Sequence, residues 1–281
     1  MYRLAKVPTT PEPTSDFTPQ DLVLTLLAAH LDRRDRRAWS GGLVTLLGEF
    51  GFSAGAARIA LGRLVHRGLL DPYRDGRYVN YALSEHAKAI LAEGDRRIFS
   101  FGRTTEPVAT WTVVWQAIPE DRRQARERLV RRLRFAGFGS LQDGTWIAPR
   151  DREREVVALV TELDVAAHVG VLLGRPSVAV DFNAVVDRAW DLSGLSARYQ
   201  AFVVEFGPYT NPAIRAELDD RAALVLRTRL VHLFRRFPTL DPELPADLAE
   251  PPVGRVDAVA LFHDLYPALA EAARRHFERM A

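Results

Sequence analysis

The chain has 281 residues, of which 47% are hydrophobic and 26% charged, and its net charge is +2. This composition excludes disordered and fibrous classes, and the length suits two or three domains. The absence of cysteine excludes disulfides, thiol catalysis and thiolate zinc sites. No apolar run approaches the roughly 18 residues of a membrane-spanning helix, and the amino terminus lacks the apolar core of a signal peptide. We therefore expect a cytoplasmic protein without a membrane partner.

Residues 1–20 are rich in proline and threonine and are expected to form a disordered tail. Apolar residues then recur at helical spacing in two segments, residues 21–31 and 39–50. A third helix is expected to begin after Ser53, a residue type that caps helix amino termini, and to end at Gly68. These three helices follow one another closely, as in a compact helical domain.

Two short strand-like runs follow and flank the dipeptide Asp75-Gly76. This dipeptide predicts a hairpin with a type I′ turn, because both central residues of that turn need positive φ. Arg74 and Arg77 bracket it. Three helices followed by a hairpin predict a winged-helix domain over residues 21–102, and in this part of the chain Lys and Arg outnumber Asp and Glu.

The third helix has two distinct faces. Apolar residues at i, i+3 and i+4 spacing predict a buried stripe that includes Ala57, Leu61 and Leu64. On the opposite face, Arg63 can reach a guanine edge and Ile59 a thymine methyl group in the major groove, whereas arginines at a wing would meet phosphate or the minor groove. The residues that we assign to DNA binding are Arg58, Ile59, Gly62, Arg63, His66, Arg67, Arg74 and Arg77.

Simpler interpretations of the same residues stay open. Arg58 can pair with Glu49, Ile59 can pack on a neighbouring domain, and the wing arginines can serve solubility alone. Winged helices also act as plain protein-interaction modules, so an adaptor that binds only protein is an alternative to DNA binding.

Residues 84–99 are expected to form a helix, and a linker follows. Residues 103–180 then show the order strand, helix, two strands joined at Asp143-Gly144, helix, strand. This β-α-β-β-α-β order predicts a ferredoxin-like domain, a fold that by itself assigns no function. Seven arginines lie between residues 122 and 134, but neighbouring acids favour a solvated helix face over a second nucleic-acid contact.

From residue 181 to the end, the pattern is helical with proline-rich breaks, and we expect a helical ligand-sensing or dimerisation domain over residues 181–281. Its aromatic residues include Trp190 and Tyr199, which can hold a ligand among helices or simply form core. The whole chain is therefore expected to be α+β.

An enzyme is the competing hypothesis. The sequence has no P-loop, no H-E-x-x-H motif and no dinucleotide-binding glycine pattern after a strand, and its seven histidines lack metal-ligand spacing. We therefore expect no catalytic residues, no cofactor and no metal site. A metal-dependent nuclease that uses Asp143 or Asp181 of the ferredoxin-like domain is the remaining enzymatic alternative.

Several stretches together resemble the PaaX-type transcriptional regulators, a family named after the repressor of phenylacetate degradation. They follow one another in the order of the family and span almost all of the chain after the tail: WSGGLVTLLGEFGFSAGAARIALGRLVHRGLL (39–70), RYVNYALSEHAKAILAEGDRRIF (77–99), WTVVWQAIPEDRRQARERLVRRLRFAGFGSLQDGTWIAPR (111–150), WDLSGLSARYQAF (190–202), FRRFPTLDPELP (234–245) and LFHDLYPALAEAARRHF (261–277).

The resemblance implies a homodimeric DNA-binding repressor with a winged helix, a ferredoxin-like middle domain and a helical carboxy-terminal domain. A symmetric dimer would place two recognition helices on a palindromic operator, and the family implies release by phenylacetyl-CoA or a similar acyl-CoA or aromatic acid. Arg235 and Arg236 match the family and can meet CoA phosphates or pair with Asp241 or Glu243.

Two positions depart from the family pattern. Arg58 and Arg63 match it, but Ile59 and Gly62 stand where relatives carry hydroxyl residues. Because those hydroxyls can contact bases, we expect a different operator sequence.

Overall fold

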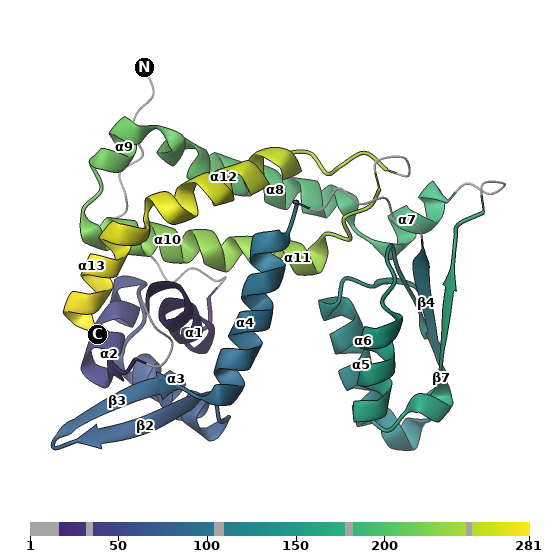
Figure 1. Cartoon of the computed structure of the whole chain (residues 1–281), viewed down its shortest axis with the longest axis horizontal. Helices are drawn as coiled ribbons and strands as arrows, with labels where there is room; N and C mark the ends of the chain where they lie inside the picture. Colours follow the sequence, from purple (N-terminus) through teal and green to yellow (C-terminus); the bar gives the residue numbers. More distant parts are fainter. Residues whose placement is uncertain (1–16, 32–35, 104–109, 178–181, 246–248) are drawn as a thin grey trace. The chain divides into compact units, whose positions relative to one another are not determined.

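The computed structural model describes residues 17–31, 36–103, 110–177, 182–245 and 249–281 (Figure 1). Most of the tail expected over residues 1–20 lies outside the described residues, but Phe17, which the sequence assigned to that tail, is buried. None of the helices that the structure describes is long and apolar enough to span a membrane.

Backbone contacts divide the chain into two compact units, each assembled from separate segments. Unit 1 comprises Met1–Phe99, Phe206–Phe234 and Ala260–Ala281, and unit 2 comprises Ser100–Glu205 and Arg235–Val259. The three domains expected from the sequence are continuous segments, so the units do not coincide with them. Those domain boundaries stay a prediction.

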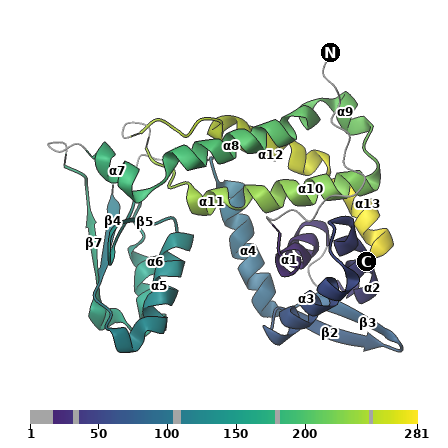
Figure 2. The same cartoon turned by 180° about the vertical axis from the view of Figure 1, so that it is seen from behind.

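Unit 1 contains the helices and the hairpin expected at the start of the chain, and helices from its end (Figures 1 and 2). Its strands form an antiparallel sheet in the order β1-β3-β2. The elements are α1 (Pro19–His30), β1 (Ala38–Trp39), α2 (Ser40–Glu49), α3 (Ala54–His66), β2 (Leu70–Asp75), β3 (Tyr78–Leu83), α4 (Glu85–Ser100), α9 (Pro212–Ala216), α10 (Asp220–Phe234) and α13 (Ala270–Met280); α8 (Leu192–Phe206) and α12 (Arg255–Ala268) contribute to both units.

The core of unit 1 joins the winged helix to the carboxy-terminal helices. Leu224 of α10 and Phe277 of α13 are buried in the same cluster as the apolar faces of α1, α2 and α3. The Trp39 N–H donates to the Ala281 carbonyl at 2.7 Å, and His276 Nε2 lies 2.9 Å from Glu49 Oε1. The winged helix therefore depends on residues about two hundred positions away in the chain.

A buried polar network connects α1 to α10 and α12. Arg227 donates to the carbonyls of Ala29 and Tyr266 and to His30 Nδ1, and His30 Nε2 lies 2.7 Å from the Thr228 hydroxyl. Burial, followed by the charge of Arg227, lowers the pKa of His30 well below its ordinary value. His30 is therefore neutral, and its Nε2–H donates to Thr228.

Unit 2 contains a four-stranded antiparallel sheet in the order β5-β6-β4-β7. α5 and α6 cover one face of the sheet (Figures 1 and 2). The β-α-β-β-α-β order predicted from the sequence and the α+β class are confirmed. The elements are β4 (Trp111–Gln116), α5 (Arg123–Phe135), β5 (Gly139–Gln142), β6 (Thr145–Ala148), α6 (Glu153–Glu162), β7 (Val169–Gly174), α7 (Asn183–Ala189) and α11 (Phe237–Leu240), with short 3₁₀ turns at Glu120–Arg122 and Ala166–His168.

Candidate nucleic-acid interface

The ends of α3 follow from its sequence. The Ser53 hydroxyl accepts from the Ala56 N–H at 3.2 Å, as an N-cap does. At the other end Gly68 has a φ of 65°, the Gly68 N–H donates to Val65, and the Leu69 N–H donates to Leu64. This pair of hydrogen bonds is a Schellman motif, which places the chain for β2 and the wing.

The two predicted faces of α3 are confirmed. Ala57, Ala60, Leu61 and Leu64 are buried in the core. The opposite face is exposed, with Ile59 at 58%. A side chain added at Gly62 would meet nothing within 4 Å. The residues that the structure brings together on this surface are Arg58, Ile59, Gly62, Arg63, His66 and Arg67.

The arginines of this surface have no acidic partner in the part of the chain that the structure describes. Among the described residues, no ion pair involves Arg58, Arg63, Arg67 or Arg74. The Arg58–Glu49 pair considered from the sequence is not formed, because Glu49 contacts His276 and Arg221. These guanidinium groups can therefore bind an external anion without breaking an internal contact.

The wing turn differs by one residue from the prediction. Asp75 pairs with Tyr78 across the hairpin, so the two turn residues are Gly76 and Arg77. Gly76 has a φ of 56°, whereas neither neighbour has positive φ. Glycine at the first central position suits a type II′ turn, which needs positive φ only there. The prediction of a type I′ turn at Asp75-Gly76 is thus wrong. Arg77 is one of the two turn residues and lies at the tip of the wing.

The outward face of the wing carries exposed aromatic residues that the sequence pattern did not single out. Trp39 and Tyr78 make an edge-to-face contact, and the Arg37 guanidinium lies 3.9 Å from the Tyr73 ring centre. Arg77 donates to the Tyr78 hydroxyl at 2.8 Å. The alternation of the hairpin was the signal available, because Tyr73 and Tyr78 occupy the face opposite the core. Stacked aromatic and arginine side chains can pack on sugar and phosphate.

The residues proposed for ligand binding are dispersed in the structure. Tyr199 is fully buried, and its hydroxyl donates to Asp241 at 2.6 Å. Burial first, and then the Asp241 charge, raise the pKa of Tyr199. Trp190 is largely buried and donates to the Gly137 carbonyl, while Arg235 is half-buried and Arg236 exposed. A ligand role for these four residues stays a prediction.

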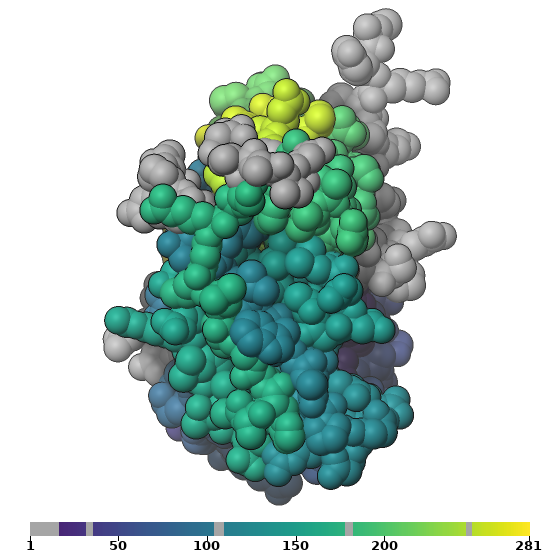
Figure 3. Space-filling model, turned by 90° about the vertical axis from the view of Figure 1, so that its right-hand side faces the viewer, coloured from purple at the N-terminus to yellow at the C-terminus, as the bar shows by residue number. Residues whose placement is uncertain are grey.

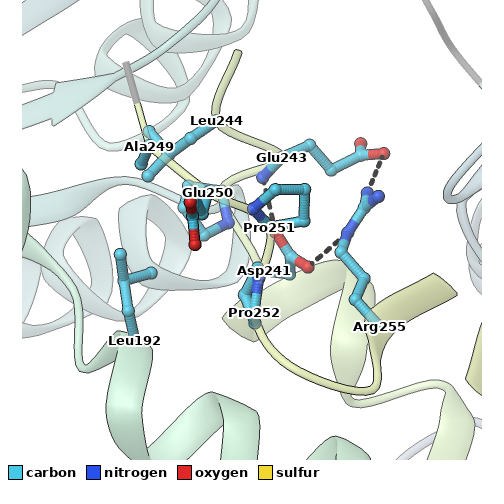
Figure 4. Close-up of a pocket in the computed structure, with 10 residues that line it drawn as sticks. Leu192, Asp241, Glu243, Leu244, Ala249, Glu250, Pro251, Pro252 and Arg255 are labelled. Carbon is cyan, nitrogen blue, oxygen red and sulfur yellow. Dashed lines mark hydrogen bonds and ion pairs between the residues drawn. The ribbon is translucent and has the colours of Figure 1, made fainter. Parts of the chain in front are cut away.

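Charged residues next to Tyr199 form a network with one another. Arg255 donates to Asp241 at 2.8 Å and to Glu243 at 3.1 Å (Figure 4). Arg150 donates to the other oxygen of Glu243 at 2.9 Å. The cavity beside these residues measures about 30 Å³, which leaves room for a water molecule but not for an organic ligand.

The enzymatic alternative depends on Asp143 and Asp181. Asp143 is an exposed turn residue, and Asp181 lies outside the described residues. In the part of the chain that the structure describes, no group of three His, Cys, Asp or Glu side chains could hold a metal ion.

Comparisons with known proteins identify the family. Three family models match successive parts of the chain: PaaX-like protein at residues 18–87, the PaaX protein central Cas2-like domain at residues 106–186, and the PaaX-like protein C-terminal domain at residues 190–279. The chain belongs to the PaaX family.

Individual relatives agree with this family. The transcriptional repressor PaaX of Escherichia coli is 27% identical over 260 residues, which cover 90% of this chain and 80% of the relative. A solved structure of an uncharacterized protein from Mycobacterium tuberculosis has a TM-score of 0.57 and 26% identity, and the match covers 94% of this chain and all of that one. Membership in the PaaX family places the chain among transcriptional regulators and not among enzymes.

Proposed function

We propose that this PaaX-family protein is a homodimeric repressor that acts in the cytoplasm. In this proposal α3 and the wing bind a palindromic operator, and an acyl-CoA or aromatic-acid effector releases the protein. The DNA-binding part of the proposal is supported by the exposed arginines around α3 and the wing tip, which have no acidic partner in the described residues. The PaaX repressor of Escherichia coli supports repression as the outcome.

The roles of the arginines follow from their positions. Arg63, at the centre of the exposed face of α3, would read a guanine edge in the major groove. Arg58 and Arg67 at its borders, with Arg74 and Arg77 on the wing, would contact phosphates and fix the register. Ile59 and Gly62 would face the bases where the family pattern described above has hydroxyl residues, so the preferred operator should differ from that of proteins with this pattern.

A DNA titration over a range of salt concentrations tests this function. We would measure fluorescence anisotropy with labelled DNA from upstream of the protein's own gene. The logarithm of the association constant should fall linearly with the logarithm of salt concentration, by about 0.9 for each phosphate contact. Absence of DNA affinity even at low salt would refute DNA binding and favour the protein-binding adaptor.

An exposed apolar sheet face supports the homodimer. On the face of the unit 2 sheet that α5 and α6 leave uncovered (Figure 3), Trp115 is 48% and Leu172 56% exposed. The Trp115 indole lies directly over Gly170, where a Cβ would come within 2.1 Å of the ring. Exposed apolar side chains on a sheet face suit the two-fold contact of identical chains.

The mass of the protein in solution, measured by sedimentation, tests this dimer. Wild-type protein should sediment with twice the chain mass, and Leu172→Glu should shift it toward the monomer because a buried carboxylate is unfavourable. Val204→Glu is the matched control, since Val204 is 77% exposed and lies on α8, away from this sheet face. A dimer that both variants retain equally would contradict this interface.

A further inference from the structure

The seven arginines of α5 and the 3₁₀ turn before it fall into two groups. Four arginines between residues 122 and 134 have carboxylate partners: Arg122 with Asp164, Arg123 with Glu127, Arg126 with Glu120, and Arg132 with Glu162. The remaining three, Arg128, Arg131 and Arg134, have no ion pair within the described residues. They recur every three residues and lie close together along the helix surface.

Arg131 and Arg134 border two adjoining hollows of unit 2. The first has a volume of about 480 Å³ and a mixed lining, in which apolar side chains of α5, α8 and α11 lie beside polar ones that include Arg198 of α8. Its rim exposes Phe135 by 55% and Leu240 by 42%. The second, of about 820 Å³, lies between α5 and the hairpin of β5 and β6 and has a more polar lining that includes Ser140. We call the two together the α5 groove.

The α5 groove also contains a buried donor without an acceptor. Trp146 lines the second hollow and is only 4% exposed, yet its Nε1–H has no hydrogen-bond partner within the described part of the chain. The Arg134 guanidinium lies 5.6 Å from the centre of the Trp146 ring. Buried polar groups are nearly always satisfied, so a donor without a partner in the described residues, next to the Arg134 guanidinium, marks a position where a bound oxygen atom would find an N–H.

The carboxylates of the α5 groove do not neutralise these cations. Glu127 is paired with Arg123, and Asp191 accepts hydrogen bonds from the Gly194 N–H and the Ser193 hydroxyl. The hydrogen bond from Gly194, and then that from Ser193, lower the pKa of Asp191, so this carboxylate is ionised but already engaged. Asp143 lies at the exposed hairpin turn and has no ion pair in the described residues. The positive charge of Arg131 and Arg134 therefore remains available.

We propose that the α5 groove binds a small organic anion that has an aromatic or acyl portion. Arg131 and Arg134 hold the anionic group, and a ligand oxygen accepts from the Trp146 Nε1–H. The apolar portion of the ligand packs against Phe135, Leu240 and Trp190, which line the first hollow. A carboxylate, sulfonate or phosphate fits two guanidinium groups one helical turn apart. This proposal rests on the proposed function, because the α5 groove would be the site at which the effector of the repressor binds.

Dye binding to the full chain tests the groove directly. The probe is 1-anilinonaphthalene-8-sulfonate, an aromatic anion whose fluorescence rises on binding. The wild-type protein should show saturable binding, and the double variant Arg131→Ala, Arg134→Ala should weaken it by about tenfold or more, because each lost charge-assisted hydrogen bond is worth at least a factor of ten. Arg128→Ala is the control: it removes the same charge from an unpaired position of α5 outside the groove, and it should leave dye affinity unchanged.

A second variant isolates the indole donor. Trp146→Phe keeps an aromatic ring in the core but removes the N–H, and we expect dye affinity to fall by about fivefold while thermal stability is unchanged or higher. Equal dye affinity in wild type, the double variant and Trp146→Phe would overturn the proposal.

Two further outcomes separate this site from DNA binding. If the double arginine variant loses DNA affinity but binds the dye normally, these arginines contact DNA and the proposed anion site is wrong. If the wild-type protein binds DNA with the expected salt dependence but binds no dye, the anion site fails and the DNA-binding function stands. Saturable dye binding without DNA affinity would support the site and refute the regulatory function.

Discussion

Replacement of Arg63 by alanine is the sharpest test of the recognition surface. The Arg63 side chain is exposed, has no ion pair among the described residues, and lies at the middle of the outward face of α3. Its removal breaks no internal contact, and alanine is at least as good a helix former as arginine. The free energy of unfolding should therefore change by less than about 0.5 kcal/mol.

The expected loss in DNA affinity is much larger. A bidentate arginine–guanine contact contributes about 1–3 kcal/mol to discrimination between bases, which corresponds to roughly a fivefold to 150-fold loss for the preferred operator. Binding to unrelated DNA depends on phosphate contacts and should change little. By contrast, Arg77→Ala at the wing tip should weaken binding to all sequences alike and reduce the salt slope by about 1.

Fluorescence anisotropy with operator and scrambled DNA measures both effects. Arg128→Ala is the charge-matched control, because it removes an exposed, unpaired arginine from α5 of unit 2. If Arg63→Ala weakens operator and scrambled DNA equally, Arg63 is a phosphate contact and not a base reader. If it weakens neither, α3 is not the recognition helix.

Three further predictions concern single residues of unit 1. Because a side chain at Gly62 meets nothing within 4 Å, Gly62→Ser should not lower the melting temperature but should change the operator chosen from a random DNA library; an unchanged choice would remove Gly62 from the interface. Arg227→Met should lower the free energy of unfolding by about 2–4 kcal/mol in urea titrations, since it removes the hydrogen bonds that the buried Arg227 side chain donates to the carbonyls of Ala29 and Tyr266; wild-type stability would contradict that role. Burial lowers the pKa of His30 in the folded protein. The unfolded chain therefore binds a proton below about pH 6.5 that the folded chain does not bind, and stability should fall as the pH drops from neutral through this range. His30→Gln should flatten this part of the urea-derived pH profile, and an unchanged slope would show that other groups cause it.

Much of the local structure was predictable from the sequence because its causes are local. Ser53 and Gly68 mark the ends of α3 through a cap and a positive φ, and the helical period separates Leu61 and Leu64 from Arg63. The hairpin was also predictable, but its turn was not. Gly76 belongs both to the predicted turn, Asp75-Gly76, and to the observed turn, Gly76-Arg77. The cross-strand pairing of Asp75 with Tyr78 selected the second, in which only Gly76 has positive φ.

The sequence alone therefore determined the order of the elements, the α+β class, the two faces of α3 and, through resemblance, the family. Tertiary structure decided which distant faces meet: Phe277 completes the core of the winged helix, and His276 rather than Arg58 contacts Glu49. Among the described residues, it also decided which arginines of α5 have no ion pair and left the Trp146 N–H without an acceptor. Periodicity reports that a residue is apolar or exposed on its own element, but contacts between residues far apart in the chain depend on how all the elements pack, and no local pattern encodes that choice.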